Sequence, residues 1–230
     1  MNADQVAALR ALLAPTGWLD RTRSFAQALR DYSRTPQGLL IVGTPEDEPW
    51  HMTAHLADES RLAEIPELAP TLVRWAPPPG APAHLRVGMD RLAVAGRHET
   101  LLVVSPQAAP AELLERVDDV RKAGATILAL DRGDPELGAL AHEALAVPER
   151  TSPLSFDAAQ HLVTAAAGEP YGPSARAAGR HSAGQRAGGQ RAADRGDYGP
   201  PGGSRGGMSL RSRLAQLLDA VSGTPAGPGD

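Results

Sequence analysis

The 230-residue sequence contains no cysteine, which excludes disulfide bonds, thiolate metal sites and cysteine nucleophiles. Aromatic residues are also scarce, at 3% of the chain. No apolar run is long enough to cross a bilayer, and the sequence does not begin with a basic segment followed by an apolar leader. We therefore expect a cytoplasmic protein that is neither exported nor inserted in a membrane.

Lysine is almost missing as well, because Lys122 is the only lysine among 23 basic residues. The charge is unevenly distributed along the chain. Residues 1–167 carry 22 acidic and 15 basic side chains, a net charge of −7, whereas residues 168–207 carry three acidic and six basic ones, a net charge of +3. An acidic body lacks the clustered positive charge that nucleic-acid binding requires. We predict no nucleic-acid partner.

Short continuous apolar runs alternate with amphipathic segments over the first 167 residues. Strands are predicted at 39–42, 71–75, 101–104, 126–130 and 144–147, and helices at 3–14, 20–32, 49–64, 83–95, 110–122, 135–142 and 155–167. Uninterrupted apolar strands are typical of a parallel sheet covered on both faces, and the alternation is that of βαβ units. The sequence therefore predicts a three-layer, doubly wound, mostly parallel α/β domain over residues 1–167. Asp20 is expected to cap the second helix, Leu62 is expected to be buried, and the helix at 83–95 is expected to rest on His84, Val87, Leu92 and Val94.

The remaining residues have a different composition. Residues 168–207 contain no Leu, Ile, Val, Met, Phe or Trp, and 16 of these 40 residues are Gly or Pro, which predicts a disordered Gly/Arg/Ala-rich linker. Residues 208–223 have the spacing of an amphipathic helix, followed by a disordered tail at 224–230. The apolar stripe of that helix consists of Leu210, Leu214, Leu217, Leu218 and Val221. An isolated helix of this length needs a surface to dock on, so we predict a protein partner or a second subunit.

Two short stretches carry a family resemblance. Lys122-Ala123-Gly124-Ala125-Thr126-Ile127 and Leu140-Ala141-His142-Glu143-Ala144 lie where a sugar isomerase (SIS) domain has an Ala-Gly-Ala strand and a short helix over Leu-Ala. The resemblance covers residues 20–167 and is clearest from residue 100 onward. It also extends to the small bacterial SIS-like proteins grouped as domain of unknown function 2529. The resemblance implies a doubly wound fold, a dimer and the binding of a phosphosugar or another carbohydrate derivative.

The loop after the third strand departs from the family pattern. SIS domains have Ser-x-Ser-Gly-x-Thr there, and small hydroxyls and a close backbone approach hold the phosphate. Ser105 keeps the first serine, but Gln107 replaces the second and Pro110 replaces the threonine. Two hydroxyl groups are lost, and a proline has no N–H to donate.

The loop after the first strand departs further. It reads Gly43-Thr44-Pro45-Glu46-Asp47-Glu48, where family members have Gly-x-Gly-x-Ser or a similar sequence. Three carboxylates at this position would repel a phosphate dianion. The candidate ligand-binding residues are therefore Gly43, Thr44, Glu46, Asp47, Ser105 and Gln107. A phosphosugar is disfavoured, which leaves an empty cleft or one adapted to a neutral or cationic ligand.

Histidines offer a separate candidate site. His51 and His55 are four residues apart on a predicted helix, so their rings could share a face and bind a metal. No third ligand follows at a motif spacing, and the His-Glu-x-x-His pattern is absent. The sequence alone therefore favours two surface histidines, and we predict no metal and no cofactor. His161 is expected at an interface or at the edge of the core.

Two functional classes remain. The first is a non-catalytic SIS-like module, a homodimer that binds a small ligand, such as a sugar derivative, or a protein through its C-terminal helix. The second is a phosphosugar isomerase or lyase, in which Thr44 and Ser105 hold the phosphate and Glu46, Asp47 or a histidine acts as the base.

Overall fold

A parallel five-stranded sheet forms the centre of the fold. The structure, a computed structural model, describes residue 13, residues 16–152 and residues 154–169. The strands are β1 (Leu39–Val42), β2 (Pro70–Val73), β3 (Thr100–Ser105), β4 (Thr126–Asp131) and β5 (Glu143–Ala146). Their order is β2-β1-β3-β4-β5, and each neighbouring pair is parallel. This order is the doubly wound arrangement, in which the chain reverses its direction of travel across the sheet between β1 and β3.

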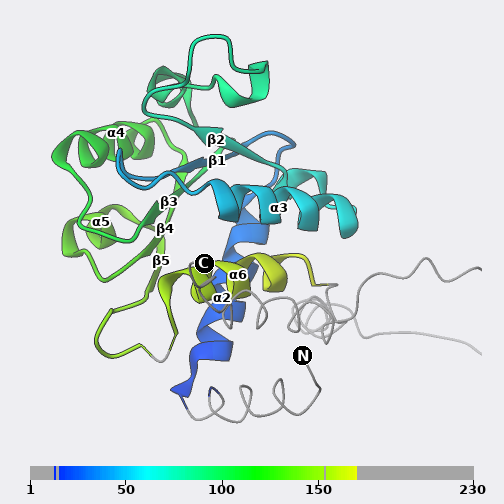
Figure 1. Cartoon of the computed structure of the whole chain (residues 1–230), viewed down its shortest axis with the longest axis vertical. Helices are drawn as coiled ribbons and strands as arrows, with labels where there is room; N and C mark the ends of the chain where they lie inside the picture. Colours follow the sequence, from blue (N-terminus) through cyan, green and yellow to red (C-terminus); the bar gives the residue numbers. More distant parts are fainter. Residues whose placement is uncertain (1–12, 14–15, 153, 170–230) are drawn as a thin grey trace, which may run out of the picture. The chain divides into compact units, whose positions relative to one another are not determined.

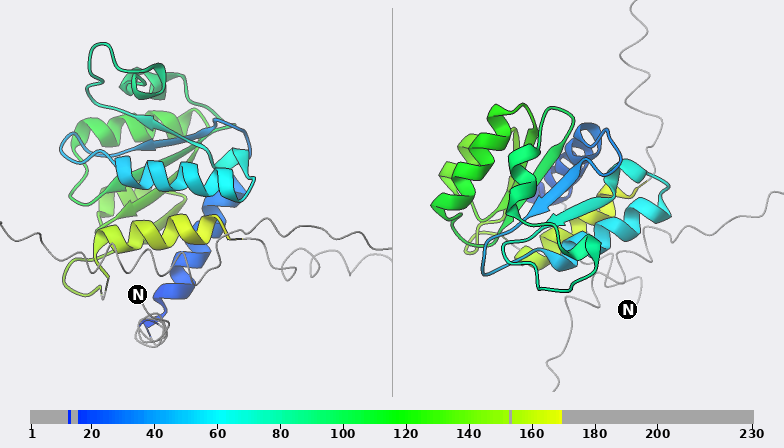
Figure 2. Two further views of the ribbon diagram at one scale, coloured as in Figure 1. Left: turned by 45° about the vertical axis from the view of Figure 1, so that its right-hand side comes forward. Right: turned by 90° about the horizontal axis from the view of Figure 1, so that it is seen from above.

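Helices cover both faces of the sheet (Figures 1 and 2). The longer ones are α2 (Trp18–Tyr32), α3 (Trp50–Leu62), α4 (Ala111–Lys122) and α6 (Phe156–Ala167), and α5 (Pro135–Leu140) is a short one. One core cluster joins α2, α3 and α6 to the sheet, and a second joins α4 and α5 to its other face. The predicted three-layer α/β fold is therefore confirmed.

The apolar strands explain why two cores form. Every residue of β3 is buried, and its side chains alternate between the layers. Leu102 and Val104 belong to the cluster beneath α2, α3 and α6, whereas Leu101 and Val103 belong to the cluster beneath α4. Each such side chain stabilises the fold by about 1.5–3 kcal/mol through burial. Burial on both faces therefore explains the uninterrupted apolar run at the centre of the strand, residues 101–104.

Some local predictions were wrong. Helix α2 begins at Trp18 after Gly17, whose φ is 68°, so Asp20 lies inside the first turn and is not the N-cap. Leu62, expected to be buried, is 51% exposed, and Val94, on which the helix at 83–95 was expected to rest, is 75% exposed. The predicted helix at 83–95 is replaced by two 3-10 helices, η3 (Ala83–Leu85) and η4 (Met89–Val94), because the backbone is extended at Gly88 between them.

Several expectations concern the C-terminal part of the chain. Gly168 ends α6, and the predicted linker from residue 170, the docking helix at 208–223 and the tail at 224–230 lie outside the described residues. Within the described part, no helix has the length and apolar character needed to cross a membrane.

Candidate functional site

The carboxyl ends of β1 and β3 bring the two predicted ligand loops to one edge of the sheet. The strands are direct neighbours, with Val42 opposite Val103. The loop at 43–48 follows β1, and the loop at 105–110 follows β3. Because the order of strands reverses between β1 and β3, this is the edge where open α/β sheets bind ligands. The topology thus places Thr44 and Ser105 on adjacent strand ends.

The loop after β1 is held tightly by its own backbone. Thr44 is buried, and its hydroxyl oxygen accepts a hydrogen bond from the N–H of Asp47 at 3.1 Å. The Gly43 carbonyl accepts a hydrogen bond from the indole of Trp75 at 2.9 Å. A Cβ at Gly43 would lie 2.1 Å from the Asp47 carbonyl oxygen and 2.6 Å from Cδ of Pro49. Only glycine fits here, and the Thr44 hydroxyl has a structural role.

Glu48 ties this loop to the end of β2. Its carboxylate accepts hydrogen bonds from Arg74 Nε at 2.9 Å, from the Trp75 N–H at 3.0 Å and from the Trp50 indole at 3.1 Å. Both side chains of the Arg74–Glu48 ion pair are only 13% exposed. Arg74 also lies over the Trp50 ring, 4.2 Å from its centre. One of the three loop carboxylates is thus neutralised, whereas Glu46 and Asp47 are exposed.

Hydrogen bonds within the protein occupy two donors of the loop after β3, the Ser105 hydroxyl and the Ala109 N–H. Ser105 is fully buried, and its hydroxyl donates a hydrogen bond to the Gln107 carbonyl at 2.6 Å. The N–H of Ala109, just before α4, donates to the carboxylate of Asp134 at 2.8 Å. Asp134 also caps α5. A serine hydroxyl and a backbone N–H that could hold an anion therefore already have partners within the protein, while the Gln107 side chain is exposed.

Asp131 lies beside Ser105 at the end of β4 and is also buried. Its carboxylate accepts hydrogen bonds from the N–H groups of Gly133 and Asp134. Burial raises the pKa of Asp131 from its ordinary value of 3.8, and the two hydrogen bonds oppose the shift. This carboxyl group organises the turn after β4.

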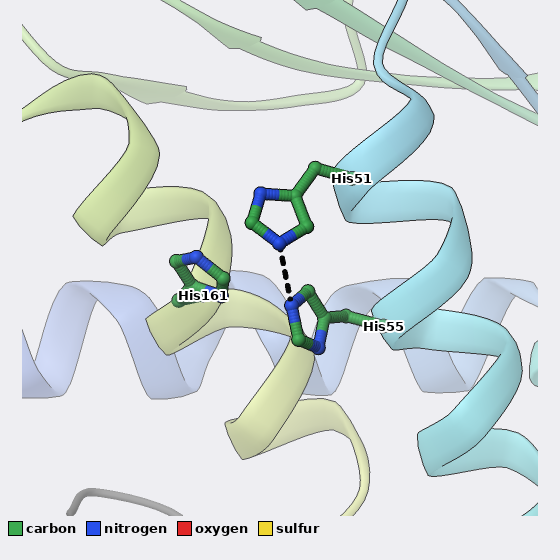
Figure 3. A group of neighbouring side chains, drawn as sticks. All are labelled: His51, His55 and His161. Carbon is green, nitrogen blue, oxygen red and sulfur yellow. Dashed lines mark hydrogen bonds between the residues drawn. The ribbon is translucent and has the colours of Figure 1, made fainter. Parts of the chain in front are cut away.

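A cluster of three histidines lies between α3 and α6 (Figure 3). His51 and His55 come from α3 and His161 comes from α6. The three ring centres are 4.6, 4.7 and 4.6 Å apart, which makes a nearly equilateral triangle. The Nε2 atoms of His51 and His55 are 2.9 Å apart and share a hydrogen bond. One nitrogen from each ring falls within 4.8 Å of the others, so these residues could together hold a metal ion.

The surroundings of His55 and His161 favour the neutral form of their rings. Burial lowers the pKa of His55, and the neighbouring His51 lowers it further. Burial also lowers the pKa of His161, with smaller contributions from His55 and His51, while Asp157 opposes them. The neutral imidazole is the form that can bind a metal.

Asp157 links the cluster to the loop after β1. It lines the same cavity as the three histidines, and its charge is the second cause, after burial, of a raised pKa at Asp47. The two candidate sites are therefore electrostatic neighbours.

The sequence placed His161 at an interface or at the edge of the core but did not connect it with His51 and His55, and it did not single out Asp157 or Gln160, which line the cavity from α6. The helical spacing of His51 and His55 was visible, but the third histidine lies on the last helix of the domain. Its only sequence signal was a polar residue beside the apolar Leu162 on α6. That signal becomes specific once α6 is known to pack against α3.

Comparison with known proteins gives a limited likeness. No model of a known protein family matches this chain, and no curated protein matches it. Two crystal structures from Salmonella typhimurium resemble it, one of a candidate phosphosugar isomerase (12% identity, TM-score 0.40) and one of a candidate sugar-binding protein (13% identity, TM-score 0.34). Both alignments cover 66% of this chain, and they cover 42% and 46% of those chains respectively. This chain thus matches less than half the length of each protein.

Proposed function

We propose that this chain is a non-catalytic binding module with an SIS-like fold, and that it takes a small neutral or cationic ligand, such as an unphosphorylated sugar derivative, at the carboxyl edge of β1 and β3. The observation that carries this proposal is the closure of the loop after β3. The Ser105 hydroxyl and the Ala109 N–H are bound to acceptors within the protein. A phosphate group that used either donor would first have to break its contact with the protein.

Charge supports the same conclusion. Glu46 and Asp47 are exposed in the loop after β1, and the charge of Asp157 acts on Asp47. Two like charges about 4 Å apart repel by about 4 kcal/mol near a protein surface, so a phosphate dianion at this edge is disfavoured. A neutral polyol could donate hydrogen bonds to the carboxylates and form hydrogen bonds with the exposed side chain of Gln107, without that penalty.

The alternative function is a phosphosugar isomerase or lyase. Its support is the position of Thr44 and Ser105, which lie on adjacent strand ends at one edge of the sheet. In that function the Ser105 hydroxyl would turn from the Gln107 carbonyl to the phosphate. Removing the hydroxyl would then weaken the binding of phosphosugars specifically.

Calorimetric titration of the full chain with hexoses, hexosamines and their 6-phosphates separates the two functions. We expect a hexose or hexosamine to bind more tightly than its own 6-phosphate. The Ser105→Ala variant should keep this order of affinities. Ser60→Ala is a matched control, because Ser60 is also buried and donates to a backbone carbonyl, that of Ile65 at 2.7 Å. Tight binding of a 6-phosphate that is lost in Ser105→Ala and kept in Ser60→Ala would establish the enzyme and refute the module.

The proposal includes the partners expected from the sequence. We infer a cytoplasmic homodimer, or a complex with another protein, joined through Leu210, Leu214, Leu217, Leu218 and Val221. The support is the apolar stripe of residues 208–223, which an isolated helix cannot bury.

A further inference from the structure

The three histidines at the α3–α6 interface meet the geometric requirements of a metal site. Residues four apart on a helix lie on one face with their Cβ atoms about 5–6 Å apart, so His51 and His55 can bind one ion together. The third ring comes from the opposing helix, and all three point toward a common centre (Figure 3). A site assembled from two packed helices is preorganised by the core beneath it, where Met52, Leu56 and Val163 are buried.

The distances fit a small tetrahedral ion. Zinc binds imidazole nitrogen at about 2.0–2.1 Å, which places neighbouring ligand atoms about 3.4 Å apart. In the cluster the His51 and His55 Nε2 atoms are 2.9 Å apart, and every ligand nitrogen lies within 4.8 Å of the others. The required spacing falls within this range, so small rotations of the rings suffice to form three metal–nitrogen bonds.

We propose that His51, His55 and His161 form a binding site for one divalent transition-metal ion of the zinc type. The three imidazoles supply three ligands, and a water molecule supplies the fourth. The cluster lines a small cavity that it shares with Met52, Asp157, Gln160 and Thr164, and the ion would lie there. His51 is exposed, so the ion has access from solvent.

Charge and donor type specify the ion. Three neutral imidazoles do not compensate a charge of +2, but Asp157 lines the same cavity and the charge of Asp58 acts on His55. Nitrogen donors favour zinc, cobalt, nickel and copper, whereas magnesium and calcium require oxygen donors. Gln160 also lines the cavity and can hydrogen-bond to the bound water.

This inference goes beyond the proposed function, because it needs only the packing of α3 against α6. Failure of sugar binding would leave it intact, and failure of metal binding would leave the ligand loops intact. The competing explanation is that the three rings merely pack at the surface between two helices. In that case they would bind zinc no better than scattered histidines do.

The first test titrates zinc into the full chain after removal of any affinity tag and treatment with a chelator. We expect one site that binds zinc and cobalt but not magnesium. His161→Gln should weaken zinc binding more than about 100-fold, since even residues outside the ligand shell cost about 10–100-fold. His84→Gln is the control, because His84 is exposed and lies outside the cluster. Equal affinity in His161→Gln and the unmodified chain would overturn the proposal.

The second test uses the absence of cysteine from the chain. His161→Cys introduces its only thiol, and a thiolate is itself a zinc ligand. We expect this variant to retain metal, and its cobalt form to acquire a thiolate-to-cobalt charge-transfer band in the near ultraviolet. The visible spectrum of the unmodified cobalt protein should be the intense one of four-coordinate cobalt. A weak six-coordinate spectrum, or no charge-transfer band in His161→Cys despite unchanged folding by circular dichroism, would refute the site.

Discussion

At the scale of the residue, buried carboxyl groups determine how this sheet edge responds to pH. Asp131 is 1% exposed, and burial raises its pKa above 3.8. A carboxyl group with a raised folded pKa contributes stability that is fully present below its unfolded pKa and is lost as pH rises through the folded pKa. As pH rises above about 4, ionisation of the buried Asp131 carboxyl therefore makes the fold less stable relative to a neutral side chain at this position.

We predict that Asp131→Asn gains stability relative to the unmodified protein as pH rises from 4 to 7. An asparagine side-chain oxygen can still accept hydrogen bonds from the N–H groups of Gly133 and Asp134, so the turn after β4 is kept. Urea unfolding at both pH values measures the difference. An advantage for Asp131→Asn that is equal at pH 4 and pH 7 would contradict the assigned cause.

At the scale of the element, the connection from β1 to α3 is tightly packed around Gly43. The close approach of Asp47 and Pro49 to Gly43 fixes the turn from which α3 begins. We predict that Gly43→Ala destabilises the protein by about 1–3 kcal/mol, as overpacking in a closed site does. Because His51 lies in the first turn of α3, the same variant should also bind zinc more weakly.

Gly138→Ala is the matched control for that substitution. Gly138 lies in α5, and a Cβ there would meet nothing within 4 Å. Alanine is favoured over glycine inside a helix by about 0.5–1 kcal/mol, so this variant should be slightly more stable. Chemical denaturation of both variants checks the signs. If Gly43→Ala left the free energy of unfolding unchanged, the loop after β1 would be able to adapt to a Cβ, and the structural role assigned to Gly43 would be wrong.

Helices and strands were readable from the sequence because each has a local cause. The uninterrupted apolar runs of β1, β3 and β4 are required by burial on both faces, and Gly124, with a φ of 95°, ends the α4 segment. The segment at 83–95 was misread because Gly88 breaks it into two 3-10 helices. Apolar spacing alone does not distinguish a helix from two such turns.

At the scale of the whole molecule, the histidine cluster shows what the sequence could not predict. The pair on α3 was visible as a spacing, but nothing local indicates that α6 packs beside α3. Helix α6 packs beside α3 because the chain, after β5, returns to the face of the sheet that α2 and α3 cover. Likewise, the closure of the Ser105 loop depends on Asp134, which reaches it from the connection after β4.

Among the described residues, the buried side chains of both core clusters lie between Leu13 and Ala167, and the sequence of residues 168–207 has no large aliphatic side chain. A chain of residues 1–169 should unfold cooperatively with a urea m-value within about 15% of that of the full chain, because m scales with the surface exposed on unfolding. Light scattering of the full chain and of a chain that lacks residues 208–230 tests the proposed dimer. If the full chain is dimeric and deletion of residues 208–230 makes it monomeric, the apolar stripe is the dimer contact. A markedly lower m-value for residues 1–169 would instead mean that the C-terminal residues complete the core. If the deletion leaves the oligomeric state unchanged, the apolar stripe is not the dimer contact and would bind a different protein.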